Sequence, residues 1–528
     1  MAQGFPRGQP WRDTVIDCRP ARRSEARAPA AGRTLTVPCR MNPRAPRGSA
    51  ASLPTPAQVA ESPLSRYRGS VDDWDAFAAA LCRPLPPCIW ANPARIDSAG
   101  LAALLAQEGV ATETLPWLPG ALRLPVQARA GQHWWYCAGL AHGQEEVSQL
   151  PVGLLDLKPG QRVLDMCAAP GGKTAQIAFA LGNRGTLIAN DIAHARIKAL
   201  QGNLDRLGLV NVTVTCSDAA NWPAAAGRFD RILLDAPCSS EGTVRRNPSM
   251  LARLDPASPA RLAPRQRALL RKAVQRLKPG GRLVYSTCTF APEENELTVA
   301  EVLAEYPDQI RLLAATVPGL IASPGLTEWE GRALPPELAR CLRIWPHQND
   351  SGGFFIAVLE KDAAAPAEPG EAEPATLDAA DSAEWLSGLD AKYGLPDGLW
   401  DGYRVHRQTN RGLHLIAADH RPPAVPRAEG SGLFFHRTNV RPPKPTTAGA
   451  MVLGLHATRF RLELNQEQRD RYLRRETFDP TPEQRAANPP GQVFAVYRGH
   501  VLGVAVLHRS GVVESLFPSR WSGCTGGV

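Results

Sequence analysis

Two cysteines stand directly after two apolar segments of the sequence, and an acidic residue accompanies them. Cys238 follows the predicted strand 231–234 and Asp235, and Cys288 follows the predicted strand 282–286. Neighbouring parallel strands end at the same edge of a sheet, so both thiols and Asp235 are expected in one crevice. A single cysteine after a strand is usually inert packing, but two beside an acid form a candidate catalytic group.

This group suits methylation of cytosine at C5. That carbon is too weakly nucleophilic to take a methyl group from a sulfonium. A thiolate that adds at C6 turns C5 into an enamine carbon, and Asp235 can protonate or hydrogen-bond N3. After methyl transfer, a base removes the C5 proton and the thiol is eliminated. One cysteine is then a nucleophile of lowered pKa and the other can assist release, but the spacing does not say which.

A glycine-containing loop lies between the predicted strand 162–166 and the predicted helix 174–181. Its residues are Cys167, Ala168, Ala169, Pro170, Gly171, Gly172 and Lys173. Glycines let the backbone approach a ligand closely. The G-x-G-x-x-G pattern of dinucleotide-binding loops is absent, and a P-loop needs glycine where residue 167 is cysteine. S-adenosyl-L-methionine remains, because it has no phosphates and needs only a loop that passes tightly over its methionine and ribose.

Acidic residues also end the next two predicted strands. Asp191 follows Asp165 by 26 residues, where a carboxylate would accept hydrogen bonds from ribose hydroxyls. Asp218 ends the third strand and can accept from the adenine amino group. A helix cap is the alternative for any one of these aspartates. Acids at three consecutive strand ends favour the cofactor interpretation.

Strands and helices alternate regularly through residues 151–361. The predicted strands are 162–166, 186–190, 212–216, 231–234, 282–286 and 354–359, and the predicted helices are 174–181, 194–207, 264–277 and 293–305. This alternation predicts an α/β fold with a doubly wound, mostly parallel, Rossmann-like sheet. Ligands bind such sheets at the carboxyl ends of the strands.

The regions before this domain differ in composition. Residues 1–60 are predicted to be a disordered basic tail, since the first 50 residues hold ten arginines and three acids. A transit peptide is the alternative, although prolines oppose the helix it needs, and a start at Met41 would make residues 1–40 a translation artefact. Residues 61–150 are predicted to form a small α+β module that binds RNA.

The regions after the domain differ as well. Residues 362–384 carry seven acids and no base, which is typical of a solvated linker. Residues 385–528 are predicted to form a C-terminal α+β module. Within it, residues 404–444 hold eight Lys or Arg and two acids, with aromatic residues between them. This pattern suits RNA, and a plain solvated face is the alternative.

Composition excludes several other classes of protein. No run approaches 18 apolar residues, so no membrane span is expected. The 11 cysteines include no Cys-x-x-Cys pair and no zinc spacing, so no metal is expected, and they indicate reduced thiols in the cytoplasm. The net charge of +9 suits a polyanionic partner.

Taken together, the motifs around these residues resemble the RsmB/RsmF and Sun-domain family of RNA cytosine-5 methyltransferases. The matching segments are 167–174, 190–191, 217–218, 235–239, 285–289, 292–296 and 343–347. The resemblance implies that Cys288 is the nucleophile and Cys238 the release cysteine. It implies that the loop 167–173, Asp191, Asp218 and Asp235 line the S-adenosyl-L-methionine site.

The resemblance extends loosely to the C-terminal module, which looks like the tail of the RsmF subgroup. It implies small-subunit ribosomal RNA, or the small ribosomal subunit, as the substrate of a monomeric enzyme. Trp90 departs from the family pattern, which has arginine there. The alternatives are transfer RNA as substrate, a catalytically silent ribosome-assembly factor that binds RNA, and a P-loop ATPase.

Overall fold

The computed structural model describes residues 52–365, 374–377 and 382–521 of the chain. The prediction of disorder for residues 1–60 is wrong at the end of that range, because helix α1 (Pro56–Glu61) begins there. Thr55 caps this helix and forms a capping box with Gln58, a local signal that the Pro- and Ala-rich composition obscured. Residues 1–51 and most of the acidic linker lie outside the described residues.

The centre of the fold is a sheet of ten strands in the described part of the chain. Five strands are parallel, in the order β9–β8–β5–β6–β7, which confirms the doubly wound fold. Their bounds are β5 (Arg162–Asp165), β6 (Thr186–Asn190), β7 (Val212–Thr215), β8 (Phe229–Asp235) and β9 (Leu277–Thr287). The strand order reverses between β5 and β8, so a ligand crevice is expected at that edge.

Four helices connect or flank these strands. They are α6 (Gly172–Ala180), α7 (His194–Leu207), α8 (Ser258–Arg276) and α9 (Glu296–Glu305). Helix α7 has the predicted bounds. Helix α8 begins six residues before the predicted start, because Pro259 occupies its first turn and Pro264 lies inside it. Proline is favoured in the first turn, and the sequence offers two prolines for that position.

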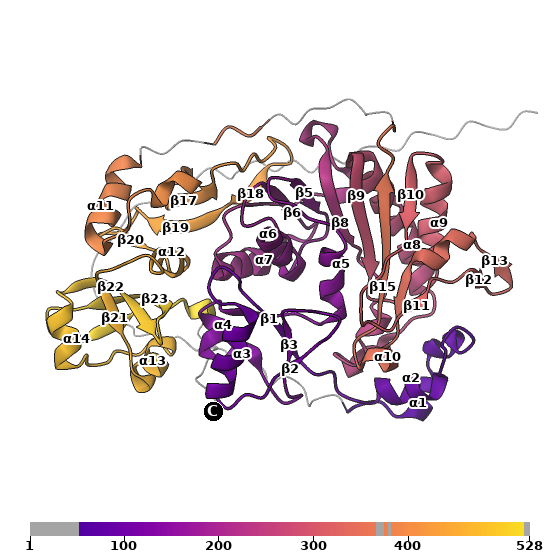
Figure 1. Cartoon of the computed structure of the whole chain (residues 1–528), viewed down its shortest axis with the longest axis horizontal. Helices are drawn as coiled ribbons and strands as arrows, with labels where there is room; N and C mark the ends of the chain where they lie inside the picture. Colours follow the sequence, from indigo (N-terminus) through magenta and orange to yellow (C-terminus); the bar gives the residue numbers. More distant parts are fainter. Residues whose placement is uncertain (1–51, 366–373, 378–381, 522–528) are drawn as a thin grey trace, which may run out of the picture. The chain divides into compact units, whose positions relative to one another are not determined.

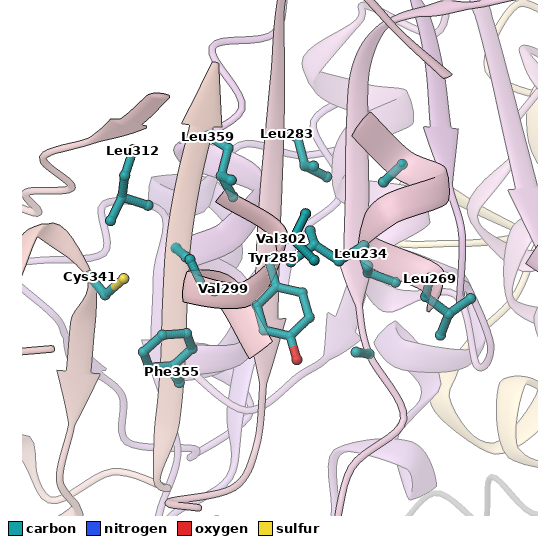
Figure 2. Packing of buried hydrophobic residues seen from close by; sticks show 14 of the residues in the cluster. Leu234, Leu269, Leu283, Tyr285, Val299, Val302, Leu312, Cys341, Phe355 and Leu359 are labelled. Atoms are coloured by element: carbon teal, nitrogen blue, oxygen red, sulfur yellow. The ribbon is translucent and has the colours of Figure 1, made fainter. Parts of the chain in front are cut away.

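Antiparallel strands extend the sheet beyond β9. Strand β15 (Phe354–Lys361) pairs with β9, and Figure 1 shows the two side by side. Beyond it are β14 (Leu342–Ile344), β11 (Ser323–Pro324) and β10 (Ile310–Leu313), and a separate hairpin joins β12 (Glu328–Trp329) to β13 (Arg332–Ala333). Figure 2 shows Leu234, Tyr285 and Phe355 of this sheet packing with Val299 of α9 and Leu269 of α8.

The N-terminal module has a four-stranded sheet in the order β2–β3–β1–β4. Its strands are β1 (Cys88–Ala91), β2 (Glu113–Thr114), β3 (Ala121–Arg123) and β4 (Ala141–Gly143). Its helices are α2 (Trp74–Leu81), α3 (Ser98–Gln107) and α4 (Trp134–Cys137), and α5 (Leu150–Gly153) follows. These elements agree with the small α+β module predicted for residues 61–150.

The C-terminal module contains two further four-stranded sheets. The first comprises β16 (Tyr403–Thr409), β17 (Gly412–Ala417), β19 (Leu433–Arg437) and β20 (Lys444–Pro445). The second comprises β21 (Arg461–Glu463), β22 (Gly491–Tyr497), β23 (His500–Leu507) and β24 (Val513–Ser515). The helices are α11 (Ala383–Tyr393), α12 (Thr447–Leu453), α13 (Gln466–Leu473) and α14 (Pro482–Ala487), while α10 (Pro346–Asn349) precedes the module.

One strand of this module joins the catalytic sheet, which the sequence did not predict. Strand β18 (Ala428–Ser431) pairs antiparallel with the edge strand β7. Its sequence, Ala-Glu-Gly-Ser, has no apolar alternation from which a strand could be recognised.

Three properties of the described residues bear on the class of protein. No helix among them has the length and apolar composition needed to cross a membrane. No group of three or more potential metal ligands occurs among them. Seven cysteines of the described residues are free thiols.

Candidate active site

The two cysteines meet at the carboxyl edge of the sheet. Cys238 Sγ lies 3.3 Å from Cys288 Sγ, although the residues are 50 positions apart in the chain. Backbone hydrogen bonds fix both loops: Ala236 N–H donates to Ser286 O at 2.9 Å, and Gly242 N–H donates to Cys288 O at 2.9 Å. The expected proximity of the thiols is therefore present.

The surroundings of the two sulfur atoms differ. The pKa of Cys288 is lowered, mainly by the hydrogen bond with Cys238, and the Ser240 hydroxyl and the Lys173 charge act in the same direction. The pKa of Cys238 is raised by that hydrogen bond and by burial. Ser240 Oγ lies 3.7 Å from Cys288 Sγ. Cys288 is therefore the thiol better suited to ionise and act as a nucleophile.

Asp235 ends β8 beside the thiols and is held from two sides. Lys173 Nζ donates to Asp235 Oδ2 at 2.7 Å, and Ser286 Oγ donates to Asp235 Oδ1 at 2.8 Å. Lys173 Nζ also donates to Ser148 Oγ at 2.7 Å. Lys173 thus links the glycine loop to the acid of the crevice. Ser148 was not predicted, because it lies outside the strand-end pattern.

Buried acids beneath the thiols form a second group that the sequence analysis missed. Glu294 accepts a hydrogen bond from Ser239 N–H at 3.0 Å and one from Gln266 Nε2 at 2.6 Å. Glu241 accepts from Tyr67 Oη at 2.8 Å and from Thr289 Oγ1 at 3.0 Å. Burial raises the pKa of both glutamates. These contacts fix the loops that carry Cys238 and Cys288.

The buried ion pair between Arg343 and Glu296 stabilises the loop that carries Cys288. Arg343 donates to both carboxylate oxygens of Glu296, at 2.6 and 2.5 Å, and to Phe290 O at 2.8 Å. Asn295 accepts from Thr287 Oγ1 at 2.6 Å and donates to Thr289 O at 3.0 Å. The motif segments 292–296 and 343–347 therefore position the loop of Cys288.

The glycine loop lies at the carboxyl ends of β5 and β6. Thr174 Oγ1 donates to the buried carboxylate of Asp165 at 2.6 Å, and burial raises the pKa of Asp165 to about 7. Ala168 N–H donates to Asn190 O at 2.7 Å, and Ala169 N–H donates to Asp191 Oδ2 at 3.2 Å. These bonds hold the loop against the two strands that flank the predicted cofactor site.

The two glycines of the loop also have a packing role. Gly171 has φ of 104°, and a Cβ there would lie 2.7 Å from Leu200 Cδ1. A Cβ on Gly172 would lie 2.8 Å from Gln144 Oε1. Both glycines were expected to allow close approach of a ligand alone, whereas the structure shows that they also allow close approach of the Leu200 and Gln144 side chains.

The aspartates predicted to bind the cofactor already have protein partners. Asp191 accepts from Ala193 N–H at 2.9 Å and pairs with Arg196 at 3.1 Å. Asp218 accepts from Ala220 N–H at 3.0 Å and from Arg265 Nη2 at 2.5 Å. The helix-cap alternative is therefore present at Asp218, which caps the short helix Ala219–Asn221, but not at Asp191. The role of both aspartates in binding a cofactor stays a prediction.

The carboxylates at this edge of the sheet nevertheless fit S-adenosyl-L-methionine. Carboxylates of Asp191, Asp218 and Asp235 follow β6, β7 and β8 along one edge of the sheet. The ligand carries a sulfonium, an ammonium, ribose hydroxyls and an adenine amino group, all of which a carboxylate attracts or accepts from. The side chain of Asp218 remains 29% exposed and that of Asp235 31% exposed.

Comparison with known proteins finds relatives of this chain. The family profile described as 16S rRNA methyltransferase RsmB/F matches residues 152–360. A solved structure of a methyltransferase homologue from Pyrococcus horikoshii is 34% identical and covers 55% of this chain and 91% of its own, with a TM-score of 0.49. Residues 152–360 therefore form a domain of the RsmB/F methyltransferase family.

Other members of the RsmB/F family match over a similar region. Ribosomal RNA small subunit methyltransferase F of Salmonella paratyphi C is 39% identical over 307 residues, or 56% of this chain. The match spans 61% of the length of that relative. The solved structure of PH0851 is 32% identical, with a TM-score of 0.52, and covers 56% of this chain and 65% of its own. The match with curated relatives thus covers about three-fifths of their length.

Proposed function

We propose that this protein methylates cytosine at C5 in RNA, with S-adenosyl-L-methionine as the cofactor and small-subunit ribosomal RNA as the substrate. The observation that carries the proposal is the 3.3 Å approach of Cys238 Sγ to Cys288 Sγ beside Asp235. Membership of the RsmB/F family supports the methyl donor and the ribosomal substrate. In this proposal the enzyme acts as a monomer in the cytoplasm.

Each group of the crevice then has one chemical task. The Cys288 thiolate adds to C6 of cytosine, which forms an S–C6 bond and makes C5 nucleophilic. Asp235, held by Lys173 and Ser286, donates a proton to N3 as negative charge develops on the ring, and takes the proton back when the S–C6 bond breaks. When bound, S-adenosyl-L-methionine supplies an electrophilic methyl group for C5. Loss of the C5 proton to a base then breaks the S–C6 bond, and Cys238 assists this release.

The substrate base must leave its stack to reach Cys288, because C6 is inaccessible inside a helix. The protein therefore has to hold the RNA on both sides of the extruded base. The N-terminal module and the basic C-terminal module supply this grip in the proposal. RNA binding would then weaken steeply with added salt, because each phosphate contact releases counterions.

A covalent trap tests the mechanism. Cys288→Ala is expected to lower methyl transfer by about 10³-fold or more and to form no adduct, because it removes the nucleophile. Cys238→Ala is expected to accumulate a protein–RNA adduct that survives denaturing electrophoresis, because addition proceeds and release does not. Cys82→Ala, at a free thiol in α2's C-cap, is the matched control and should behave as the wild type.

Other outcomes would reject parts of the proposal. Adducts in Cys288→Ala and none in Cys238→Ala would reverse the two roles. Normal turnover in both variants would rule out covalent catalysis. RNA binding by the wild-type protein without any methyl transfer would favour a silent assembly factor.

A further inference from the structure

A cavity of about 770 Å³ lies away from the thiols, between the catalytic sheet and the C-terminal module. Strand β18 creates one wall by pairing with β7, and α7 supplies another. Gly430 of β18 lies so close to α7 that a Cβ there would meet Gln201 Nε2 at 2.9 Å. The remaining walls come mainly from β16, β17, β19, β20, α12, residues 516–519 and Trp521.

Four cationic side chains line this cavity: Arg411, Arg437, Lys444 and Arg475. Three of them are neighbours across strands, since Gly412, next to Arg411, pairs with Arg437, and Arg437 pairs with Lys444. Burial and the charge of Arg437 lower the pKa of Lys444. Like charges so close together repel unless an anion lies between them.

No acid of the described residues neutralises these cations by direct contact. The ion pairs of the described part of the chain include none of the four, although Asp205 and Glu429 also line the cavity. The side chains of Arg411, Arg437 and Arg475 are exposed. They are therefore available to an anion that enters the cavity.

An aromatic ring lies beside the cations. Phe434 lines the cavity and is only half-buried. The guanidinium carbon of Arg437 lies 5.3 Å from the centre of its ring. The ring of His414 lies 5.0 Å away at 30°, and burial together with His406 lowers the pKa of His414 to about 3, so this imidazole is neutral. A flat ring with cations on one side suits a nucleobase joined to a phosphate.

We propose that this cavity binds a short segment of single-stranded RNA, with a base stacked on Phe434 and the backbone phosphates along Arg411, Arg437 and Lys444. The proposal rests on the proposed function for the identity of the polymer. The cations lie in register across neighbouring strands, just before β17, at the end of β19 and in β20, and such a row fits a backbone of several phosphates better than one free phosphate. The site would hold RNA outside the crevice that receives the target base.

Binding of a cytosine-free oligonucleotide tests the site without depending on methyl transfer. The probe is a fluorescein-labelled RNA of eight adenosines, titrated by anisotropy with the full chain and no methyl donor. Phe434→Leu keeps an apolar side chain but removes the flat ring, and it is expected to weaken binding about 10-fold. Arg411→Gln with Arg437→Gln is expected to weaken binding by a similar factor and to reduce the salt slope by about 1.4.

The control makes the same change of charge elsewhere. Arg332→Gln with Arg509→Gln removes two exposed arginines that do not line the cavity, and it should bind the probe within about 2-fold of the wild type. Thermal unfolding midpoints equal to that of the wild type would show that each variant is folded. Probe binding that is unchanged in both cavity variants, or lost equally in the control, would overturn the proposal.

Competition distinguishes RNA from other anions. Displacement of the probe by adenosine monophosphate or inorganic phosphate at the concentration of RNA nucleotides would identify a small-ligand site and overturn the RNA proposal. Displacement by polyglutamate of equal charge would favour an acidic peptide and overturn it as well. Wild-type protein that binds the probe in the cavity but transfers no methyl group would reject the proposed function alone.

Discussion

The crevice of Cys238 and Cys288 and the cavity lined by Arg411 and Arg437 differ in whether their charged groups have partners within the protein. In the crevice, Lys173 contacts both Asp235 and Ser148, and Glu294 accepts from Ser239 and Gln266. In the cavity, Arg411 and Arg437 belong to no ion pair of the described residues. Partners inside the protein fix a group in position, whereas a group without one is left for a partner outside. The first arrangement suits catalysis and the second suits binding.

The largest effect on stability is expected from removal of one partner of the buried ion pair between Arg343 and Glu296. Arg343→Met leaves the Glu296 carboxylate buried without its partner, which is expected to lower the free energy of unfolding by about 3–5 kcal/mol. Urea denaturation measures the change. Arg437→Met in the cavity is the contrast and should change stability by only about 0.5 kcal/mol, because the side chain is exposed.

A double variant separates the pair from the packing around it. Arg343→Met with Glu296→Leu should recover much of the lost stability, because no unpaired charge remains buried. If Arg343→Met alone is as stable as the wild type, the pair does not hold the loop of Cys288.

The next largest effect is expected at Lys173. Lys173→Met removes the cation that holds Asp235 at 2.7 Å, and kcat should fall about 10²-fold, since the acid would no longer be positioned. Lys278→Met is the matched control, because Lys278 Nζ contacts Asp230 Oδ1 at 2.8 Å near the start of β8, whereas Asp235 ends the same strand. Equal losses of kcat in both variants would point to a general effect on the sheet.

Sequence reasoning worked best where local pattern decides the structure. Strands β5, β6 and β7 and helix α7 match their predicted bounds within one residue, because a parallel sheet buries continuous apolar runs, whereas β9 begins five residues before its predicted start. The meeting of Cys238 with Cys288 follows from the same rule, since both end parallel neighbours. The site could be inferred because strand order alone brings it together.

The parts that were missed depend on contacts between distant segments. Glu241 is held by Tyr67, 174 positions earlier, and Ser148 reaches the crevice only through Lys173. Strand β18 pairs with β7 through backbone groups, which any sequence can supply. Residue type gave no signal in these cases, because the partner is chosen by the tertiary fold.

The pKa of the Cys288 thiol should rise when its hydrogen-bond partners are removed, which tests whether contacts within the crevice prepare this thiol for catalysis. Its lowered pKa means that the thiolate is present below the usual thiol value of 9.0, so iodoacetamide should modify Cys288 at lower pH than a free thiol. Cys238→Ala removes the main cause, and the midpoint of the rate–pH curve should rise. Mass spectrometry of the peptide with Cys288 measures the rate, and Ser240→Ala should give a smaller rise. Identical midpoints in the wild type, Cys238→Ala and Ser240→Ala would show that hydrogen bonds with Cys238 and Ser240 do not lower the pKa of Cys288.

Asp218 is partly exposed but has partners within the protein, so it is intermediate between the paired groups of the crevice and the cations of the cavity, which are unpaired within the described residues. Its substitution should give the smallest effect, a change in affinity for the cofactor. It is 29% exposed, yet it accepts from Ala220 N–H and from Arg265. Asp218→Ala should weaken binding of S-adenosyl-L-methionine about 5-fold in calorimetry, because one hydrogen-bond acceptor is lost. Arg265→Gln breaks an exposed ion pair and should change affinity by about 2-fold or less. If Arg265→Gln weakens binding as much as Asp218→Ala, the aspartate acts through its pair and does not itself contact the cofactor.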